Sequence, residues 1–230
     1  MKRRDQHLLI DGDDTLWECN AFFERAIEEF IDLVDHATLS RDEVRGVLDE
    51  IELARVAEHG YGAAGFARSL RECLERVAEQ PVAEADLDRA EELGATMAEH
   101  PMEIIDGVEE TLDYLAGRHR LLLVTKGDAE EQRLKVERSR LVHHFDTVVI
   151  VPEKSVDTYA TLADEGSVER GRAWMIGNSP RSDVNPALAA GLNAVFVPHS
   201  ATWRLEHEDI ADGPGELLVV DSFGELVEHF

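Results

Sequence analysis

The sequence predicts an α/β protein with a doubly wound parallel sheet at its core and an inserted domain made only of helices. After residue 100, short apolar runs alternate with amphipathic segments. Strands as apolar as these need cover on both faces, which is typical of a parallel sheet between helices. Between residues 20 and 99, apolar residues recur at helical spacing alone. We therefore place the sheet domain in residues 1–16 and 101–230, and the helical domain in residues 17–100.

The first strand is predicted at residues 7–10, where an apolar run ends in the acidic loop Asp11–Asp14. Four helices fit the insert that follows. Breaks between them are expected at residues 36–40, at residues 60–65 and at Gln80–Pro81. Ser40 can cap the second helix, with Glu43 at the capping-box position. The proline at position 81 suits the start of the fourth helix.

The region after residue 101 alternates helices and strands to the end of the chain. The predicted strands are residues 121–124, 147–151, 173–176, 194–197 and 217–220. The predicted helices are residues 108–116, 130–137, 156–163, 184–190 and a short one at the C-terminus. Helical crossovers of this kind join parallel strands, so this region completes the sheet that the first strand begins.

The composition is that of a folded and strongly acidic chain. The 230 residues include 49 acidic and 23 basic side chains, and the net charge of −26 disfavours nucleic acids and anionic membranes as partners. No apolar stretch approaches the ~20 residues that span a bilayer. The apolar run near the N-terminus is too short for a signal peptide. We expect a cytoplasmic protein, monomeric or homodimeric, whose acidity fits a salt-adapted proteome as well as a GC-rich genome.

Residues with catalytic potential follow the predicted strands at their carboxyl ends, where open parallel sheets bind ligands. In chain order they are Asp11 and Asp13, then Thr125, Lys126 and Gly127, then Lys154, then Asn178 and Asp183. Carboxylates that repel one another in one site indicate a divalent cation, and oxygen ligands select Mg²⁺. The strand-to-helix turn at residues 125–127 offers a hydroxyl and backbone N–H groups to an anion. A phosphoryl group would fit between the divalent cation and this turn.

Each of these residues also has an ordinary structural interpretation. A pair of aspartates after a strand is often a solvated turn, Thr125 can cap the helix that follows it, and Lys154 can be a surface lysine. Asp183 can complement a helix dipole, and Asn178 can belong to the turn before that helix. Their placement, one group at each strand end, favours a shared site.

The residues of these strand ends resemble the motifs of a known family. The run from Leu8 to Leu16, LLIDGDDTL, is similar to the first motif of the haloacid dehalogenase superfamily, an apolar strand followed by D-x-D-x-T-L. Thr125, Lys154 and the segment 177–183 match the later motifs in order. The resemblance covers the whole α/β part and implies a Rossmannoid core. The insert falls where that family places its first type of helical cap.

The resemblance also implies roles for individual residues. Asp11 would be the nucleophile that forms an aspartyl-phosphate, and Asp13 the general acid and base, with a pKa raised by neighbouring negative charge. Lys154 would offset charge on the nucleophile and the phosphate. The phosphoryl oxygens would be bound by Thr125, Lys126 and Gly127. Mg²⁺ would be held by Asp11, the backbone carbonyl of Asp13, Asn178 and Asp183.

One position departs from the family pattern. The fourth motif usually begins Gly-Asp, whereas Asn178 follows Gly177 here. An amide oxygen can bind Mg²⁺ but carries no charge, so we expect weaker metal affinity.

The function implied is hydrolysis of a small, soluble phosphate ester with Mg²⁺, because a closing cap would exclude a protein substrate. Asp13 argues against a dehalogenase, since a halide leaving group needs no proton. The lack of lysine in residues 17–100 argues against a phosphonatase, which needs one to form a Schiff base. A phosphomutase and a non-catalytic binding protein with a degenerate site remain as alternatives.

Overall fold

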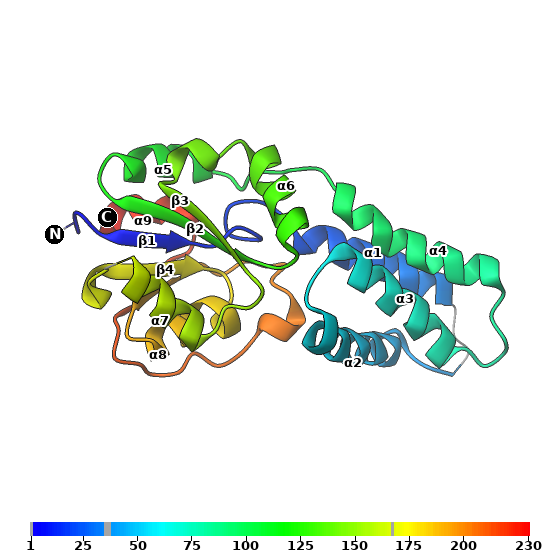
Figure 1. Ribbon diagram of the computed structural model, residues 1–230. Helices are drawn as coiled ribbons and strands as arrows, with labels where there is room; N and C mark the ends of the chain where they lie inside the picture. Colours follow the sequence, from blue (N-terminus) through cyan, green and yellow to red (C-terminus); the bar gives the residue numbers. More distant parts are fainter. Residues whose placement is uncertain (1, 35–37, 167) are drawn as a thin grey trace. The chain divides into compact units, whose positions relative to one another are not determined.

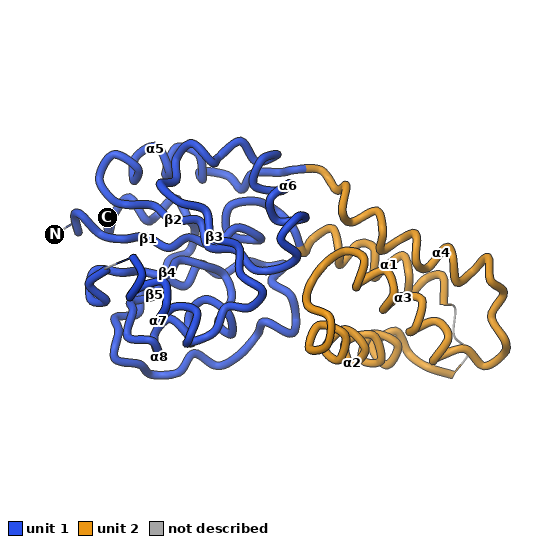
Figure 2. Tube along the Cα trace, viewed as in Figure 1, with its two compact units in different colours: residues 1–19, 102–230 blue, residues 20–101 orange. Residues whose placement is uncertain are grey.

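The computed structural model describes residues 2–34, 38–166 and 168–230, so part of the predicted break at 36–40 lies outside the described residues. The chain divides into two compact units, coloured separately in Figure 2. The sheet unit comprises Met1–Cys19 and Met102–Phe230, and the helical unit comprises Asn20–Pro101.

Residues 17–19 belong to the sheet unit, although the sequence assigns them to the helical domain. The physical reason is Trp17, whose side chain is fully buried in the hydrophobic core of the sheet unit. Residue 101 belongs to the helical unit rather than to the sheet domain.

A six-stranded parallel sheet runs through the sheet unit (Figure 1). Its strands are β1 (His7–Ile10), β2 (Arg120–Lys126), β3 (Thr147–Val151), β4 (Ala173–Gly177), β5 (Asn193–Phe196) and β6 (Leu217–Val219). They are ordered β3-β2-β1-β4-β5-β6, and every neighbouring pair is parallel. The predicted doubly wound α/β core is therefore confirmed. Because β1 lies between β2 and β4, residues that follow these three strands reach the same edge of the sheet.

Helices cover both faces of the sheet (Figure 1). They are α5 (Val108–Ala116), α6 (Ala129–Ser139), α7 (Val156–Glu165), α8 (Asn185–Ala189) and α9 (Leu226–His229). The side chains of β1 alternate between the faces, as a strand requires. Leu8 and Ile10 pack in the cluster that contains residues of α5, α6 and α9, whereas Leu9 packs in the cluster of α7 and α8. This two-sided burial explains the continuous apolar run in the sequence.

The helical unit contains α1 (Asn20–Val34), α2 (Arg41–His59), α3 (Ala63–Val77) and α4 (Glu84–Ala95), packed around their own apolar core. Four helices were expected here, and these four are present in the described residues. The fourth begins at Glu84 rather than at Pro81, because Ala83 is its N-cap. Among the described residues, no helix combines the length and apolar character needed to cross a membrane.

The predicted capping box at the start of α2 is present. The Ser40 side chain accepts a hydrogen bond from the Glu43 N–H, and the Glu43 carboxylate accepts one from the Ser40 N–H at 2.8 Å. We expect Ser40→Ala to lower the free energy of unfolding of the helical unit by about 1 kcal/mol, because the first turn loses its cap. Urea denaturation measures this, with Ser40→Asn, another good cap, as the control. Equal stability of the alanine variant and the natural chain would contradict the expectation.

Candidate active site

Asp11 follows β1 directly and is held at the carboxyl edge of the sheet. Its N–H donates to the carbonyl of Ile176 at 2.9 Å, which extends the pairing of β1 with β4. The chain then turns tightly at Gly12, where a Cβ atom would lie 2.6 Å from the Trp17 ring. This turn brings the Thr15 hydroxyl back to donate to Asp11 Oδ2 at 3.1 Å.

A buried ion cluster joins Asp11 to the third and fourth strand ends. The Lys154 ammonium contacts Asp11 Oδ1 and lies 2.7 Å from Asp183 Oδ1. All three side chains are buried. The pKa of Asp11 is raised to about 7, because burial and the nearby Asp183 carboxylate outweigh the opposing effect of Lys154. One ammonium therefore faces two carboxyl groups, and the cluster has an excess of negative charge when both are ionised.

A π-helical turn, Pro180–Val184, places Asp183 in this cluster. The turn precedes α8, where the sequence predicts a helix from residue 184. Asp183 Oδ2 accepts the Ser179 N–H at 3.0 Å and packs against Gly177. A side chain at Gly177 would collide with the Asp183 carboxylate, which explains the glycine at the end of β4.

Asn178 turns its amide oxygen toward the Asp11 side of the cluster. Its Nδ2 donates to Thr202 Oγ1 at 2.8 Å, and its Oδ1 lies 3.2 Å from Thr15 Oγ1. The same Thr15 hydroxyl contacts Asp11 Oδ2. The oxygens of Asn178 and Asp11 thus lie around one hydroxyl group.

This group of side chains fits a magnesium ion in its chemistry. The donors are carboxylate, amide and hydroxyl oxygens, which are the ligands that Mg²⁺ prefers. The excess negative charge of Asp11 and Asp183 is what a divalent cation would neutralise, since an unpaired buried charge is costly. The arrangement of Asn178 is compatible with its predicted place in the ligand set.

The three residues predicted to bind phosphoryl oxygens are engaged with other groups. Thr125 Oγ1 donates to Gln132 Oε1 at 3.0 Å, and the Gly127 N–H donates to the Val151 carbonyl at 3.1 Å. The expected free N–H groups at the start of α6 are partly occupied, because the Asp128 side chain accepts from the N–H groups of residues 130 and 131. A phosphate would have to displace some of these contacts.

Lys126 forms a second buried network that sequence reasoning missed. Its Nζ lies 2.6 Å from Glu206 Oε1 and 2.7 Å from Ser182 Oγ. Glu206 also accepts from the hydroxyls of Ser179 and Ser182. Burial opposes ionisation of Glu206, but Lys126 and the two serines lower its pKa. No motif marks Glu206, since its segment joins the site only through tertiary packing.

Asp13 is surrounded differently from the expectation. Lys135 Nζ lies 2.9 Å from Oδ1 and 2.8 Å from Oδ2 of Asp13, and Gln132 Nε2 donates to Oδ2 at 2.9 Å. Trp17 Nε1 donates to Oδ1 at 2.7 Å. Burial opposes the charged form, but the Lys135 ammonium and these hydrogen bonds lower the pKa of Asp13 to about 2. The predicted rise of this pKa is therefore wrong for the protein without substrate.

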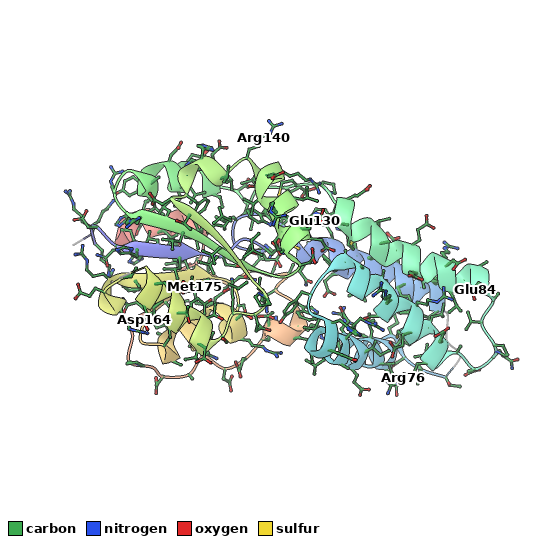
Figure 3. The ribbon with its side chains drawn as sticks, viewed as in Figure 1. Arg76, Glu84, Glu130, Arg140, Asp164 and Met175 are labelled. Atoms are coloured by element: carbon green, nitrogen blue, oxygen red, sulfur yellow. The ribbon has the colours of Figure 1, made fainter. Side chains whose placement is uncertain are left out.

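Gln132 and Lys135 were not among the predicted site residues. They lie three positions apart on α6, so they share one face of the helix (Figure 3 labels Glu130 at its start). The available signal in the sequence was weak. Lysine is scarce in this chain, with four among 23 basic residues. Lys135 also lies on the helix that directly follows the turn at Thr125.

Asp14, Glu18 and His199 form a separate group whose potential ligand atoms all lie within 4.8 Å of one another. Local contacts account for them. Asp14 Oδ1 accepts the Cys19 N–H at 2.9 Å, and His199 Nε2 lies 3.2 Å from Glu18 Oε1.

Comparisons with known proteins agree with the geometry. A family model described as haloacid dehalogenase-like hydrolase matches residues 33–197. N-acylneuraminate-9-phosphatase of Mus musculus is 27% identical over 202 residues, or 83% of this chain and 81% of that protein. Pyrimidine 5'-nucleotidase YjjG of Escherichia coli is 26% identical over 129 residues, 53% of this chain and 54% of that protein.

Solved structures share the fold over nearly the whole chain. A haloacid dehalogenase-like family hydrolase from Xanthomonas campestris has a TM-score of 0.83 and 30% identity, covering 98% of this chain and 91% of that one. The L-2-haloacid dehalogenase of Xanthobacter autotrophicus has a TM-score of 0.60 and 16% identity, with 97% of each chain covered, and shows the fold alone.

Proposed function

The chain belongs to the haloacid dehalogenase-like hydrolase family, and on this basis we propose that it is a phosphatase that hydrolyses a small phosphate monoester through an aspartyl-phosphate at Asp11. The observation that carries the proposal is the buried Asp11 carboxylate, paired with Lys154 and followed two residues later by Asp13. Curated relatives, one named as a phosphatase and one as a 5'-nucleotidase, support the reaction class.

In the first half of the reaction, a carboxylate oxygen of Asp11 forms a bond to phosphorus, and the bond from phosphorus to the ester oxygen breaks. Lys154 favours the ionised form of Asp11 that this attack needs. Asp13 gives a proton to the leaving oxygen. A bound phosphate places negative charge near Asp13, and like charge favours the protonated form of a carboxyl group.

In the second half, water attacks the aspartyl-phosphate, and Asp13 takes the proton from that water. Inorganic phosphate leaves, and Asp11 returns as a carboxylate. The low pKa of Asp13 keeps it anionic in the free protein, so it takes up a proton from solvent as the substrate binds and returns one to solvent after phosphate leaves. Asp13 therefore serves alternately as acid and base.

We place Mg²⁺ at Asp11, Asn178, Asp183 and the backbone carbonyl of Asp13, where it would offset the charge of the phosphoryl oxygens when bound. Thr125, Lys126 and Gly127 would contact those oxygens after exchanging their present partners. The substrate class is a small phosphorylated metabolite. Sugar-acid phosphates and pyrimidine nucleotides, suggested by the names of the relatives, are the first compounds to test.

The test is release of inorganic phosphate by the purified chain from a panel of esters with and without Mg²⁺. The panel includes N-acylneuraminate 9-phosphate, pyrimidine 5'-nucleotides, other sugar phosphates and para-nitrophenyl phosphate, at low and high salt. Turnover that needs Mg²⁺ supports the proposal. If no ester is hydrolysed under any condition, the chain is better interpreted as a non-catalytic binding protein.

Asn178→Asp tests the proposed metal site. The added carboxylate should tighten Mg²⁺ binding on the order of tenfold, because ligand charge controls affinity at such sites. Without metal, the variant should be less stable, since the aspartate cannot donate to Thr202 as the amide does. Isothermal titration with Mg²⁺ measures the affinity. Gln80→Glu adds the same charge to an exposed position and serves as the control. Unchanged affinity in Asn178→Asp would remove Asn178 from the ligand set.

A further inference from the structure

Two side chains of α6, those of Gln132 and Lys135, contact the Asp13 carboxylate. Lys135 Nζ contacts both carboxylate oxygens, at 2.9 and 2.8 Å, and Gln132 Nε2 reaches Oδ2 at 2.9 Å. The Lys135 side chain is only 14% exposed, so this is not a solvated surface pair. Its ammonium also lies 3.2 Å from Cys19 Sγ.

Gln132 joins Asp13 to the second strand end. Its Oε1 accepts the Thr125 hydroxyl at 3.0 Å while its Nε2 donates to Asp13, so the amide is fixed at both ends. Gly127 makes room for it. With φ of +136°, a Cβ atom at Gly127 would lie 3.1 Å from Gln132 Nε2. The turn after β2 is thus shaped around this glutamine.

Every oxygen of the Asp13 carboxylate has more than one donor. Oδ1 receives Trp17 Nε1 at 2.7 Å as well as Lys135, and Oδ2 receives both Gln132 and Lys135. Three donors from two segments leave the carboxylate one orientation. A group that must meet a reacting oxygen benefits from this, since misplacement of about 1 Å can cost on the order of a hundredfold in rate.

We propose that Gln132 and Lys135 are positioning residues that hold the Asp13 carboxyl group in line with the leaving-group oxygen of the substrate. We call this pair the Asp13 clamp. The inference rests on the proposed phosphatase function. It adds two residues that act through Asp13 and do not touch the substrate themselves.

The clamp should matter in proportion to the leaving group's need for a proton. An alkyl phosphate releases a strongly basic oxygen that must be protonated as the bond breaks, whereas para-nitrophenolate leaves without one. The ratio kcat/KM reports events up to departure of the leaving group, so it separates this step from later hydrolysis of the aspartyl-phosphate. A merely structural defect would lower kcat/KM for both esters alike.

The experiment compares Lys135→Met and Gln132→Met with the natural chain, using the best alkyl phosphate of the panel and para-nitrophenyl phosphate. We expect kcat/KM for the alkyl ester to fall roughly 10- to 100-fold more than for the aryl ester. Lys135→Arg, which keeps the positive charge, should restore part of the difference. Arg133→Met removes a charge from the exposed face of α6 and should leave both substrates unchanged.

Each outcome decides the proposal. The clamp is overturned if kcat/KM falls equally for both esters, or does not fall, in Lys135→Met and Gln132→Met. The proposed phosphatase function would remain intact. If Lys135→Met does not fold, Gln132→Met and Lys135→Arg carry the same comparison. If the natural chain hydrolyses no ester, the proposed function fails and the clamp fails with it.

Discussion

Asp11→Asn should lower the rate of phosphate release by at least ~10⁴-fold, because the amide cannot form the aspartyl-phosphate. The side chain keeps its size and its place after β1, so the sheet should be undisturbed. Lys154 would then face Asp183 alone, with one ammonium for one carboxylate. We therefore expect the variant to be at least as stable as the natural chain in the absence of metal.

The measurement combines steady-state phosphate release with mass spectrometry of acid-quenched protein. The natural chain should show a phosphorylated species during turnover, and Asp11→Asn should show none. Asp157→Asn, which removes an exposed carboxylate on α7, is the matched control and should behave like the natural chain. Phosphate release by Asp11→Asn near the natural rate would exclude Asp11 as the nucleophile.

Glu52→Gln should stabilise the helical unit at neutral and alkaline pH. Glu52 lies buried on α2, and its Oε2 atom has no hydrogen-bond partner among the residues that the structure describes. Arg45 is near but is engaged by Glu24 at 2.6 Å and by Asp49 at 2.8 Å. The pKa of Glu52 is raised to about 8, because burial and the carboxylates of Asp49 and Glu24 outweigh the opposing effect of Arg45.

The direction of the pH dependence follows from the raised pKa. Below about pH 4.5 the Glu52 carboxyl group is protonated in both the folded and the unfolded chain, so its ionisation does not lower the free energy of unfolding. Between about pH 4.5 and 8 the unfolded chain loses the proton while the folded chain keeps it, and stability falls as pH rises. Above pH 8 the free energy of unfolding has fallen by its full amount, on the order of 3–5 kcal/mol for a pKa shift of this size.

Urea denaturation of the natural chain and of Glu52→Gln at several pH values tests this. The free energies of unfolding of the two proteins should be similar near pH 4.5. As pH rises they should diverge, with Glu52→Gln the more stable. Glu75→Gln, an exposed change on α3, should follow the natural chain throughout. If Glu52→Gln gains no stability between acid and alkaline pH, Glu52 is ionised at low cost and its burial carries no penalty.

The fold was predictable because its signals are local. The apolar run at residues 7–10 marks a strand covered on both faces, and the structure shows Leu8 and Leu9 in clusters on opposite faces. Ser40 and Glu43 mark a helix start by their spacing alone. The start of α4 was misplaced at Pro81, since a proline is also compatible with the extended segment before the N-cap.

The sequence pointed to the residues at the strand ends, but not to Gln132, Lys135 and Glu206, nor to the contacts among them. Lys154 reaches Asp11 and Asp183 as the order of strand ends suggests. The partners of Asn178 could not be foreseen, because Thr202 arrives from a segment without a motif. The low pKa of Asp13 in the protein without substrate could not be foreseen, because Lys135, far along the chain, could not be placed beside it.

The sequence by itself determined which segments are strands, where the helical insert lies, and which residues follow each strand. It could do so because hydrophobic period, turn residues and motif spacing are properties of neighbours in the chain. Only the tertiary structure decided which face of α6 meets Asp13 and where Glu206 lies. The electrostatics of a buried carboxyl group depend on distances of a few ångströms between residues more than a hundred positions apart, and folding alone sets those distances.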